Sequence, residues 1–567
     1  MPSDSAPPSF DLTRQPWLPV QRQDGSQDEL SLLEVFRQAG ELRRLVGDVP
    51  TQEFALVRLL LAILHDAVDG PADLDEWQDL WEGGLPVDRI TSYLERHRDR
   101  FDLLHPEQPF FQAASLRTAT GEVSSLDRLV ADVPNGVPFF TMRARGVSRL
   151  GFAEAARWVV HAHAYDTSGI KTGVVGDSRV KGGKIYPQGV AWAGTLGGVL
   201  IEGENLRQTL LLNLIAFDTD NLRIAPDQDL PAWRRPPAQP GAADPLQMAG
   251  RPAGLRDLYT WQSRRVRLFF DAEGVNGVIL TYGDVLEPRN RHRSEPMTTW
   301  RRSQAQEKKH GLALVYLPRE HDPSRSAWRG LGALIASSAS GAGQRGEAAS
   351  SIRPRVVDWA ARLTVEGDLP PDHLFRARLF GAVYGTQQSV IDEVVDDAVT
   401  MPLVLLHERD SRLGQTAIDA VSDAERAVTV LGDLAADLAR AAGADGEPAK
   451  DAAHSSGYTT LDGAFRTWLA GLRPTHDPLE RRAAWQRRAH RIVSRLGDEL
   501  LRAAGHAAWE GRVIKTKNGQ ELWLSASQAD LTFRARLRAA LPEAAPAGSP
   551  PDPAQGEGQP RDVEAQV

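Results

Sequence analysis

Apolar residues recur at helical spacing in several stretches of the chain. Residues 152–163 place an apolar side chain inward at every third or fourth position, which predicts a helix with one buried face. Residues 54–67 are apolar nearly all round, so we expect a fully buried helix there, with Thr51 as its N-cap. Ser31 and Glu34 form a capping-box pattern, which predicts the start of a short helix.

The helical pattern disappears between residues 167 and 189. The glycines of this stretch are Gly169, Gly173, Gly176, Gly182, Gly183 and Gly189, and its basic residues are Lys171, Arg179, Lys181 and Lys184, against the single acid Asp177. Glycines allow a backbone to approach a ligand closely, and basic side chains neutralise phosphates. A phosphate-binding P-loop is excluded because Gly183-Lys184 is followed by Ile185. The stretch is therefore either a nucleic-acid contact or a solvated surface loop.

Strand-like patterns follow in two regions. Residues 255–286 predict strands joined by a turn around 274–277, and residues 376–399 predict a β-hairpin with Gly385-Thr386-Gln387-Gln388 at its tip. After Pro402 the sequence becomes helical to about residue 540. Six residues there repeat by threes and fours, the pattern of a bundle helix: Val421, Ala424, Val428, Leu431, Ala435 and Leu438. These patterns together indicate the α+β class.

A stripe of arginines marks the later helical region. Trp485, Ile492 and Leu496 recur at helical spacing and should face a core. Four arginines of the same segment are each seven apart, namely Arg481, Arg488, Arg495 and Arg502, and Arg491 lies beside this stripe. The stripe has few acids at a spacing of four residues to pair with. It is either a solvated face or a surface that meets displaced DNA or an acidic partner.

Composition narrows the class of protein. The 567 residues contain no cysteine, which excludes disulfides and thiolate zinc sites. No apolar run approaches the ~20 residues that span a bilayer, and residues 1–17 lack a signal-peptide pattern, so we expect a cytoplasmic protein. The net charge of −9 argues against a freestanding nucleic-acid binder or general RNA-binding module, but permits local basic patches. Residues 289–309 are the densest such patch.

Metal-dependent hydrolysis is the alternative class. His161, His163 and Asp166 lie close in sequence, although two residues on a helix separated by two positions point about 200° apart. His65-Asp66 resembles the metal pair of HD phosphohydrolases, but a core histidine is the better interpretation. The last candidate ligands are Asp218, Asp220, Asp227 and Asp229, which lack the spacing of a calcium loop and are predicted to form a solvated loop.

The order and spacing of several motifs resemble the CasA family, the large subunit of the type I-E CRISPR complex Cascade. The motifs are PWLPV (16–20), LSLLEVF, RLLLAIL, HPEQPFFQ (105–112), the AYDTSGIKTG…RVKGGK loop, LLLNLI and LFGAVYGTQQSVIDE. The resemblance runs from about residue 10 to about residue 540. It implies an α+β N-terminal domain at 10–400 and a C-terminal four-helix bundle at 401–541, with residues 1–9 and 542–567 expected to be disordered.

The resemblance also implies a non-catalytic function without a cofactor. Family members bind the 5′ handle of the guide RNA and recognise the protospacer-adjacent motif on double-stranded DNA. They start strand separation and help to recruit the helicase–nuclease, while guide–target pairing reads the remaining sequence. The expected partners are therefore the other Cascade subunits, the guide RNA, the target duplex and the helicase–nuclease, with no membrane.

Individual positions carry the family's functional parts. The glycine loop that approaches the minor groove matches Gly169-Ile170-Lys171-Thr172-Gly173, with Thr172 at one expected glycine. The glutamine wedge that parts the strands matches Gln387-Gln388, and Gln388 is the first choice. The loop that contacts the RNA handle matches Phe139-Phe140-Thr141. Further expected DNA contacts are Lys181 and Lys184 on the glycine-rich loop, and Arg488 and Arg495 on the arginine stripe.

One family feature has no counterpart in this sequence. Some members carry a lysine finger or a zinc-bound cysteine knot in the hairpin after a WQ dipeptide, here Trp261-Gln262. Residues 271–277 occupy that hairpin without lysine or cysteine, so zinc bound by such a knot is excluded. The role of the lysine is either absent or moved to Lys171, Lys181 or Lys184.

Overall fold

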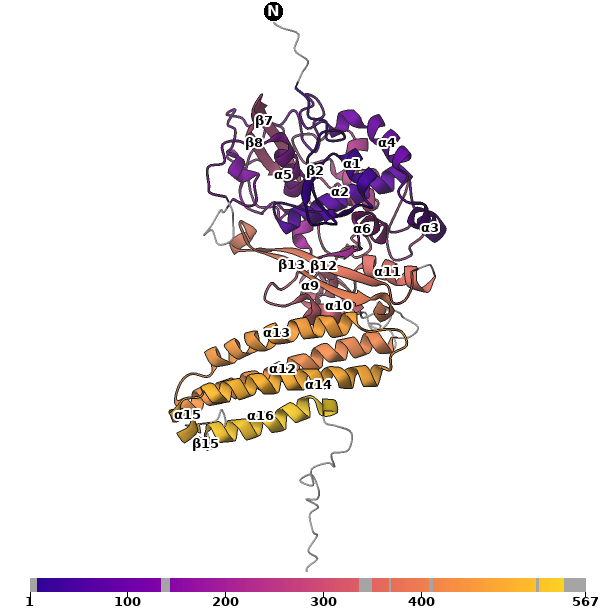
Figure 1. Cartoon of the computed structure of the whole chain (residues 1–567). Coiled ribbons are helices and arrows are strands. Elements are labelled where there is room, and N and C mark those ends of the chain that lie inside the picture. The colour runs from indigo at the N-terminus through magenta and orange to yellow at the C-terminus, as the bar shows by residue number, and fades with distance from the viewer. Residues whose placement is uncertain are drawn as a thin grey trace, which may run out of the picture. The chain divides into compact units, whose positions relative to one another are not determined.

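The computed structural model describes residues 8–133, 143–335, 349–366, 369–406, 411–515 and 520–544. The chain divides into two compact units. The first unit comprises residues 1–415 and 469–474, and the second comprises residues 416–468 and 475–567. The first unit mixes helices and strands and the second is mainly helical, as Figure 1 shows, so the predicted α+β class with a C-terminal bundle is confirmed.

The first unit begins with a small antiparallel sheet of order β2-β1-β3, formed by β1 (Leu18–Arg22), β2 (Gln27–Leu30) and β3 (Leu42–Leu45). Helix α1 (Leu32–Gln38) follows β2. Ser31 accepts a hydrogen bond from the Glu34 backbone N–H and the Glu34 carboxylate accepts one from Ser31, so the predicted capping box is confirmed.

The central element of this unit is α2 (Pro50–Val68), in which every residue from Thr51 to Val68 is buried. The predicted N-cap is wrong. The helix begins at Pro50, whose missing N–H suits a first helical position, and Val49 is the N-cap without a side-chain hydrogen bond. Thr51 instead hydrogen-bonds His161 Nε2 at 2.9 Å. Helix α2 packs against α5 (Phe152–Tyr165), α8 (Leu255–Tyr259) and the neighbouring sheet.

That sheet has the order β13-β12-β6 and is antiparallel, with β6 (Gly198–Glu202), β12 (Leu374–Tyr384) and β13 (Ile391–Pro402). The two long strands lie side by side in Figure 1, and the predicted hairpin is confirmed. Buried ion pairs tie the sheet and its surroundings to α2: Arg378 pairs with Glu53, and Arg58 makes a two-pronged pair with Glu295 at 2.8–2.9 Å. A stiff support therefore carries the glutamine tip.

A second hairpin consists of β7 (Arg264–Asp271) and β8 (Gly274–Tyr282). The strand predicted at its start is wrong for residues 255–259, which form α8. The buried carboxylate of Asp229 accepts the backbone N–H groups of Arg256 and Asp257 and so caps this helix. Asp229 is accordingly a buried cap and not part of a solvated loop, a tertiary contact that local sequence cannot reveal.

The remaining elements of the first unit are short. The helices are α3 (Leu74–Gly83), α4 (Val87–Arg96), α6 (Leu206–Leu212), α7 (Pro245–Met248), α9 (Gln304–His310), α10 (Leu331–Ile335) and α11 (Arg355–Val365). The strands are β4 (Lys171–Thr172), β5 (Lys184–Ile185), β9 (Trp300–Arg302), β10 (Tyr316–Pro318) and β11 (Ser351–Ile352).

Four long helices form the second unit: α12 (Arg412–Ala442), α13 (Glu447–Ala470), α14 (Pro478–Ala503) and α16 (Ala526–Ala540). Between the last two lie α15 (His506–Glu510) and the hairpin of β14 (Arg512–Lys515) and β15 (Glu521–Leu524). The six predicted seam residues of α12 are all buried. On α14, Trp485 and Leu496 are buried as predicted, but Ile492 is only half-buried because Val493 takes the core position.

None of the helices in the described ranges has the length and apolar character needed to cross a membrane.

Candidate nucleic-acid interface

The predicted glycine loop begins where α5 ends. Residues 171–172 form β4, which pairs with β5 so that Lys171 lies opposite Ile185. Gly169 has a φ of +135°, a conformation that favours glycine. A Cβ added to Gly173 would lie 2.8 Å from the backbone of Gly183, so this position also requires glycine for the close approach of the two chain segments. The glycines therefore shape the loop itself.

The side chain of Lys171 points into the protein. Its ammonium group pairs with Asp166 at 2.7–2.8 Å, and both side chains are about nine-tenths buried. Arg264 on β7 pairs with the same carboxylate and donates to the carbonyls of Asp166, Thr167 and Gly189. Burial opposes ionisation of Asp166, but the charges of Lys171 and Arg264 outweigh it and lower the pKa of this carboxyl group. Asp166 thus holds the loop with two cations.

Tyr282 on β8 fixes the other side of the loop. Its hydroxyl group accepts a 3.0 Å hydrogen bond from the Gly169 N–H and donates a 2.6 Å hydrogen bond to the Gly169 carbonyl. The Arg264 guanidinium lies 4.8 Å from the centre of the Tyr282 ring, a cation–π contact. The backbone at Gly169 is therefore held in one conformation before any ligand binds.

The glutamine tip is exposed and conformationally strained. Gln387 and Gln388 both have φ of 55°, a region that non-glycine residues rarely adopt, and both side chains face solvent. Such strain is concentrated at functional sites. The tip reaches the glycine loop, because a Cβ added to Gly169 would lie 3.7 Å from the Cβ of Ser389. The two separately predicted parts are adjacent.

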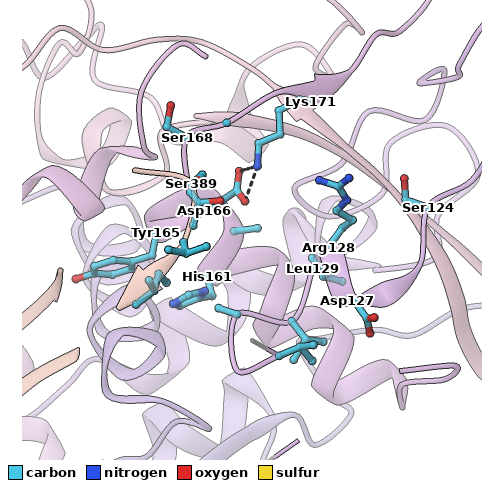
Figure 2. A pocket seen from close by; sticks show the side chains of 18 of the residues that line it. Ser124, Asp127, Arg128, Leu129, His161, Tyr165, Asp166, Ser168, Lys171 and Ser389 are labelled. Atoms are coloured by element: carbon cyan, nitrogen blue, oxygen red, sulfur yellow. Dashed lines mark hydrogen bonds and ion pairs between the residues drawn. The ribbon is translucent and has the colours of Figure 1, made fainter. Parts of the chain in front are cut away.

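An open hollow of about 1150 Å³ lies at this junction. Residues from the segments 122–133, 161–171 and 389–393 line it, and Figure 2 shows the Lys171–Asp166 pair at its wall, with Arg128 nearby. Arg128 is exposed, and within the described part of the chain its guanidinium has no hydrogen-bond or ion-pair partner. Sequence analysis missed Arg128 because a single arginine in a turn carries no pattern.

The other basic residues of the loop divide into two kinds. Arg179 pairs with Asp177 and donates to the carbonyls of Tyr282 and Gly283, so it is structural. Lys181 and Lys184 are exposed, and over the described residues neither forms an ion pair. These two lysines are the loop's available positive charges.

The two histidines of the metal-site alternative form hydrogen bonds within the protein core. His161 bonds Thr51, and His163 Nε2 lies 2.8 Å from the Phe111 carbonyl oxygen. Burial lowers the pKa of His161 to about 3 and that of His163 to about 4, so both are neutral core histidines. Across the described ranges, no cluster of three or more histidine or acidic side chains could hold a metal ion.

Comparison with known proteins assigns the family. Residues 11–496 match the model of the family described as CRISPR-associated protein Cse1. The chain belongs to this family. A Thermus thermophilus protein described as CRISPR-associated protein CasA/Cse1 is 32% identical over 332 residues, which cover 58% of this chain and 60% of that relative. The resemblance to CasA is therefore confirmed.

Two solved structures agree in fold over almost the whole chain. Cse1 from Thermobifida fusca is 66% identical with a TM-score of 0.88, and the match covers 95% of this chain and 99% of that one. Cse1 from Acidimicrobium ferrooxidans is 31% identical with a TM-score of 0.79, with the same two coverages.

In this Cse1 chain the tip of the hairpin that was predicted to lack a lysine finger carries the acids Asp271 and Glu273. Arg149 pairs with Asp271 and lies 3.3 Å from Glu273, and its hydrogen bonds to Asp271 lower the pKa of that carboxyl group. The role of the lysine finger was predicted to be either absent or moved to Lys171, Lys181 or Lys184. Of these three lysines, Lys171 is internally paired, whereas Lys181 and Lys184 are exposed. The predicted RNA-handle contact, Phe139-Phe140-Thr141, lies outside the described residues.

Two further surfaces carry several arginines, one on α14 and one around residues 289–293. On α14 the side chains of Arg488, Arg491 and Arg502 are exposed, Arg495 lies 3.8 Å from Glu499, and Arg481 bonds His476. In the first unit a hollow of about 530 Å³ gathers Arg223, Arg289, Arg291 and Arg293 around the single acid Glu287. This hollow contains the start of the basic segment 289–309.

Proposed function

We propose that this Cse1-family chain is the non-catalytic large subunit of a type I-E CRISPR surveillance complex. In this proposal it recognises the protospacer-adjacent motif in duplex DNA, initiates strand separation and helps to recruit the helicase–nuclease. The observation that carries the proposal is the adjacency of Gly169 and Ser389, which brings a rigid glycine loop and an exposed glutamine tip to one hollow.

The glycine loop suits minor-groove docking. Its backbone is fixed by Tyr282 and by the Asp166 pairs, so docking requires little further ordering. The minor groove is narrow and offers a degenerate pattern of hydrogen-bonding groups, which a backbone without bulky side chains can approach. Lys171 serves in this account by positioning the loop, and its backbone remains part of the contact surface.

The glutamine tip suits insertion beside the docked motif. A side chain that parts base pairs must resist displacement, and Gln388 stands on two long paired strands anchored to α2 through Arg378. The strained φ values of Gln387 and Gln388 present both side chains outward at the end of this support. Strand separation then begins next to the motif.

Phosphates are neutralised by Lys181, Lys184 and Arg128, all exposed near the glycine loop or the hollow. The arginine hollow at 289–293 extends the basic surface of the first unit, and Arg488 and Arg495 supply a second surface on the bundle. We further propose that Phe139-Phe140-Thr141 contacts the 5′ handle of the guide RNA and that other Cascade subunits hold this acidic chain on nucleic acid.

The test is duplex binding by the complex reconstituted with and without this subunit. Duplexes should be identical except in the base pairs next to the protospacer. The proposal predicts that the complete complex discriminates among them and that the complex without this subunit does not. Equal discrimination by both complexes would contradict it.

A further inference from the structure

The ribbon of β4 and β5 has two chemically different faces. Lys171 and Ile185 are paired across the ribbon, and both are buried. The residues next to them, Ile170 and Tyr186, are exposed by 49% and 55%. Because successive side chains of a strand point to opposite faces, the inward pair leaves Ile170 and Tyr186 on the outward face.

Continued one residue beyond the ends of β4 and β5, the register brings these two outward residues together. Lys171 lies opposite Ile185 and Thr172 opposite Lys184 in an antiparallel pair, so extending the register by one residue sets Ile170 opposite Tyr186. Directly opposite side chains of such a pair are neighbours. The outward face thus carries an aliphatic and an aromatic side chain, with Thr172 and Lys184 one step further along.

The charges around this apolar pair identify its partner. Lys181 and Lys184 lie on the same loop without ion pairs among the described residues, whereas the loop's one acid, Asp177, is neutralised by Arg179. Exposed Lys184 lies two residues from Tyr186 and so shares its face of the ribbon, while Asp392 and Glu393 line the hollow beside Ile170. An apolar surface with cations on the side of Tyr186 complements a nucleobase flanked by phosphates. Aromatic stacking and basic side chains are the usual combination in such binding.

We propose that Ile170 and Tyr186 form a platform that packs against a nucleobase of the bound duplex, at the edge of the base pair where the strands part. The proposal rests on the proposed function and deepens it. Ile170 follows Gly169 directly, and Gly169 adjoins the glutamine tip through Ser389, so the platform and the tip address neighbouring base pairs. The platform would hold the last intact pair while the tip separates the next.

The experiment uses the reconstituted complex and duplexes with single 2-aminopurine substitutions at and beside the motif. Tyr186→Ala and Ile170→Ala remove the platform, Tyr186→Phe keeps the ring, and Val175→Ala is the control, since Val175 is an exposed apolar residue of the same loop. We expect Tyr186→Ala to weaken duplex binding roughly five- to hundredfold and to change the fluorescence of one 2-aminopurine position. Tyr186→Phe and Val175→Ala should behave as the unmodified chain does.

The outcomes separate this proposal from the function on which it rests. If the unmodified complex discriminates motifs and Tyr186→Ala leaves both affinity and fluorescence unchanged, the platform is wrong and the proposed function stands. If Tyr186→Ala instead prevents the subunit from entering the complex, the surface binds protein and the platform is also wrong. A complex that discriminates no motif overturns the proposed function itself.

Discussion

The hydroxyl group of Tyr384 donates a 2.7 Å hydrogen bond to the backbone carbonyl of Tyr165. This bond joins the last residue of β12 to the last residue of α5, one at the base of the glutamine tip and the other at the entrance of the glycine loop. Burial raises the pKa of Tyr384 well above its usual range, so the hydroxyl remains a donor at neutral pH. The bond therefore connects the elements that carry the two parts of the proposed site directly.

Tyr384→Phe should therefore uncouple the tip from the loop. The substitution leaves the Tyr165 carbonyl without this donor, and we expect the free energy of unfolding to fall by about 1–2 kcal/mol. Strand opening by the complex should slow while initial duplex binding stays close to that of the unmodified chain. Stopped-flow 2-aminopurine fluorescence measures both steps, and unchanged opening would show that the bond does not transmit the position of the tip.

Gln388→Ala should weaken strand separation more than initial duplex binding, because the wedge acts after docking. Permanganate footprinting of the opened duplex measures this effect. Gln388→Gly is the matched variant, since glycine relieves the strain at a φ of 55° but also removes the side chain. We expect both variants to open DNA poorly and Gln388→Gly to be the more stable protein. Equal opening by the variants and the unmodified chain would exclude the wedge.

Lys181 and Lys184 should account for the loop's phosphate contacts. Replacing both with Ala should reduce the slope of log affinity against log salt by about 1.8, since each lost contact contributes about 0.9. Lys171→Met should leave the slope unchanged but destabilise the fold by about 3 kcal/mol, because it removes one partner of a buried ion pair. A slope that responds to Lys171 and not to the other two would reverse these assignments.

The bundle stripe is tested by charge reversal. Arg488→Glu with Arg495→Glu should leave the subunit folded, because both side chains are exposed, but should reduce either its incorporation or the complex's hold on unwound DNA. Lys515→Glu, on the hairpin of the same unit, is the control. Incorporation and DNA retention equal to those of the unmodified chain would assign the stripe to solvent.

Local signals explain which predictions succeeded. The Ser31–Glu34 capping box and the hairpin ending at Gln387-Gln388 depend on residues close in sequence, and both are confirmed. Lys171 shows the limit. The basic composition of the loop around Lys171 suggested an exposed phosphate contact. The structure instead pairs Lys171 with Asp166, which also pairs with Arg264, a residue almost a hundred positions further along the chain.

The α8 helix and Arg128 were missed for a similar reason. The cap of α8 comes from Asp229, which lies in a different segment, and Arg128 becomes noticeable only when three segments form the hollow around it. Neither relationship has a local sequence pattern. The family resemblance placed the glycine loop and the glutamine tip along the chain, but only the structure shows that they adjoin.

The central claim is that the glycine loop and the glutamine tip act on the same short stretch of duplex. The chain contains no cysteine, so single cysteines at Thr172 and at Thr386 can each carry an iron–EDTA cleavage reagent without background labelling. In the reconstituted complex, the account predicts cleavage from both positions within the motif and the base pairs directly beside it, and none there from the cysteine-free chain treated with the same reagent. Cleavage from the two positions more than one helical turn apart, or from neither, would contradict the account.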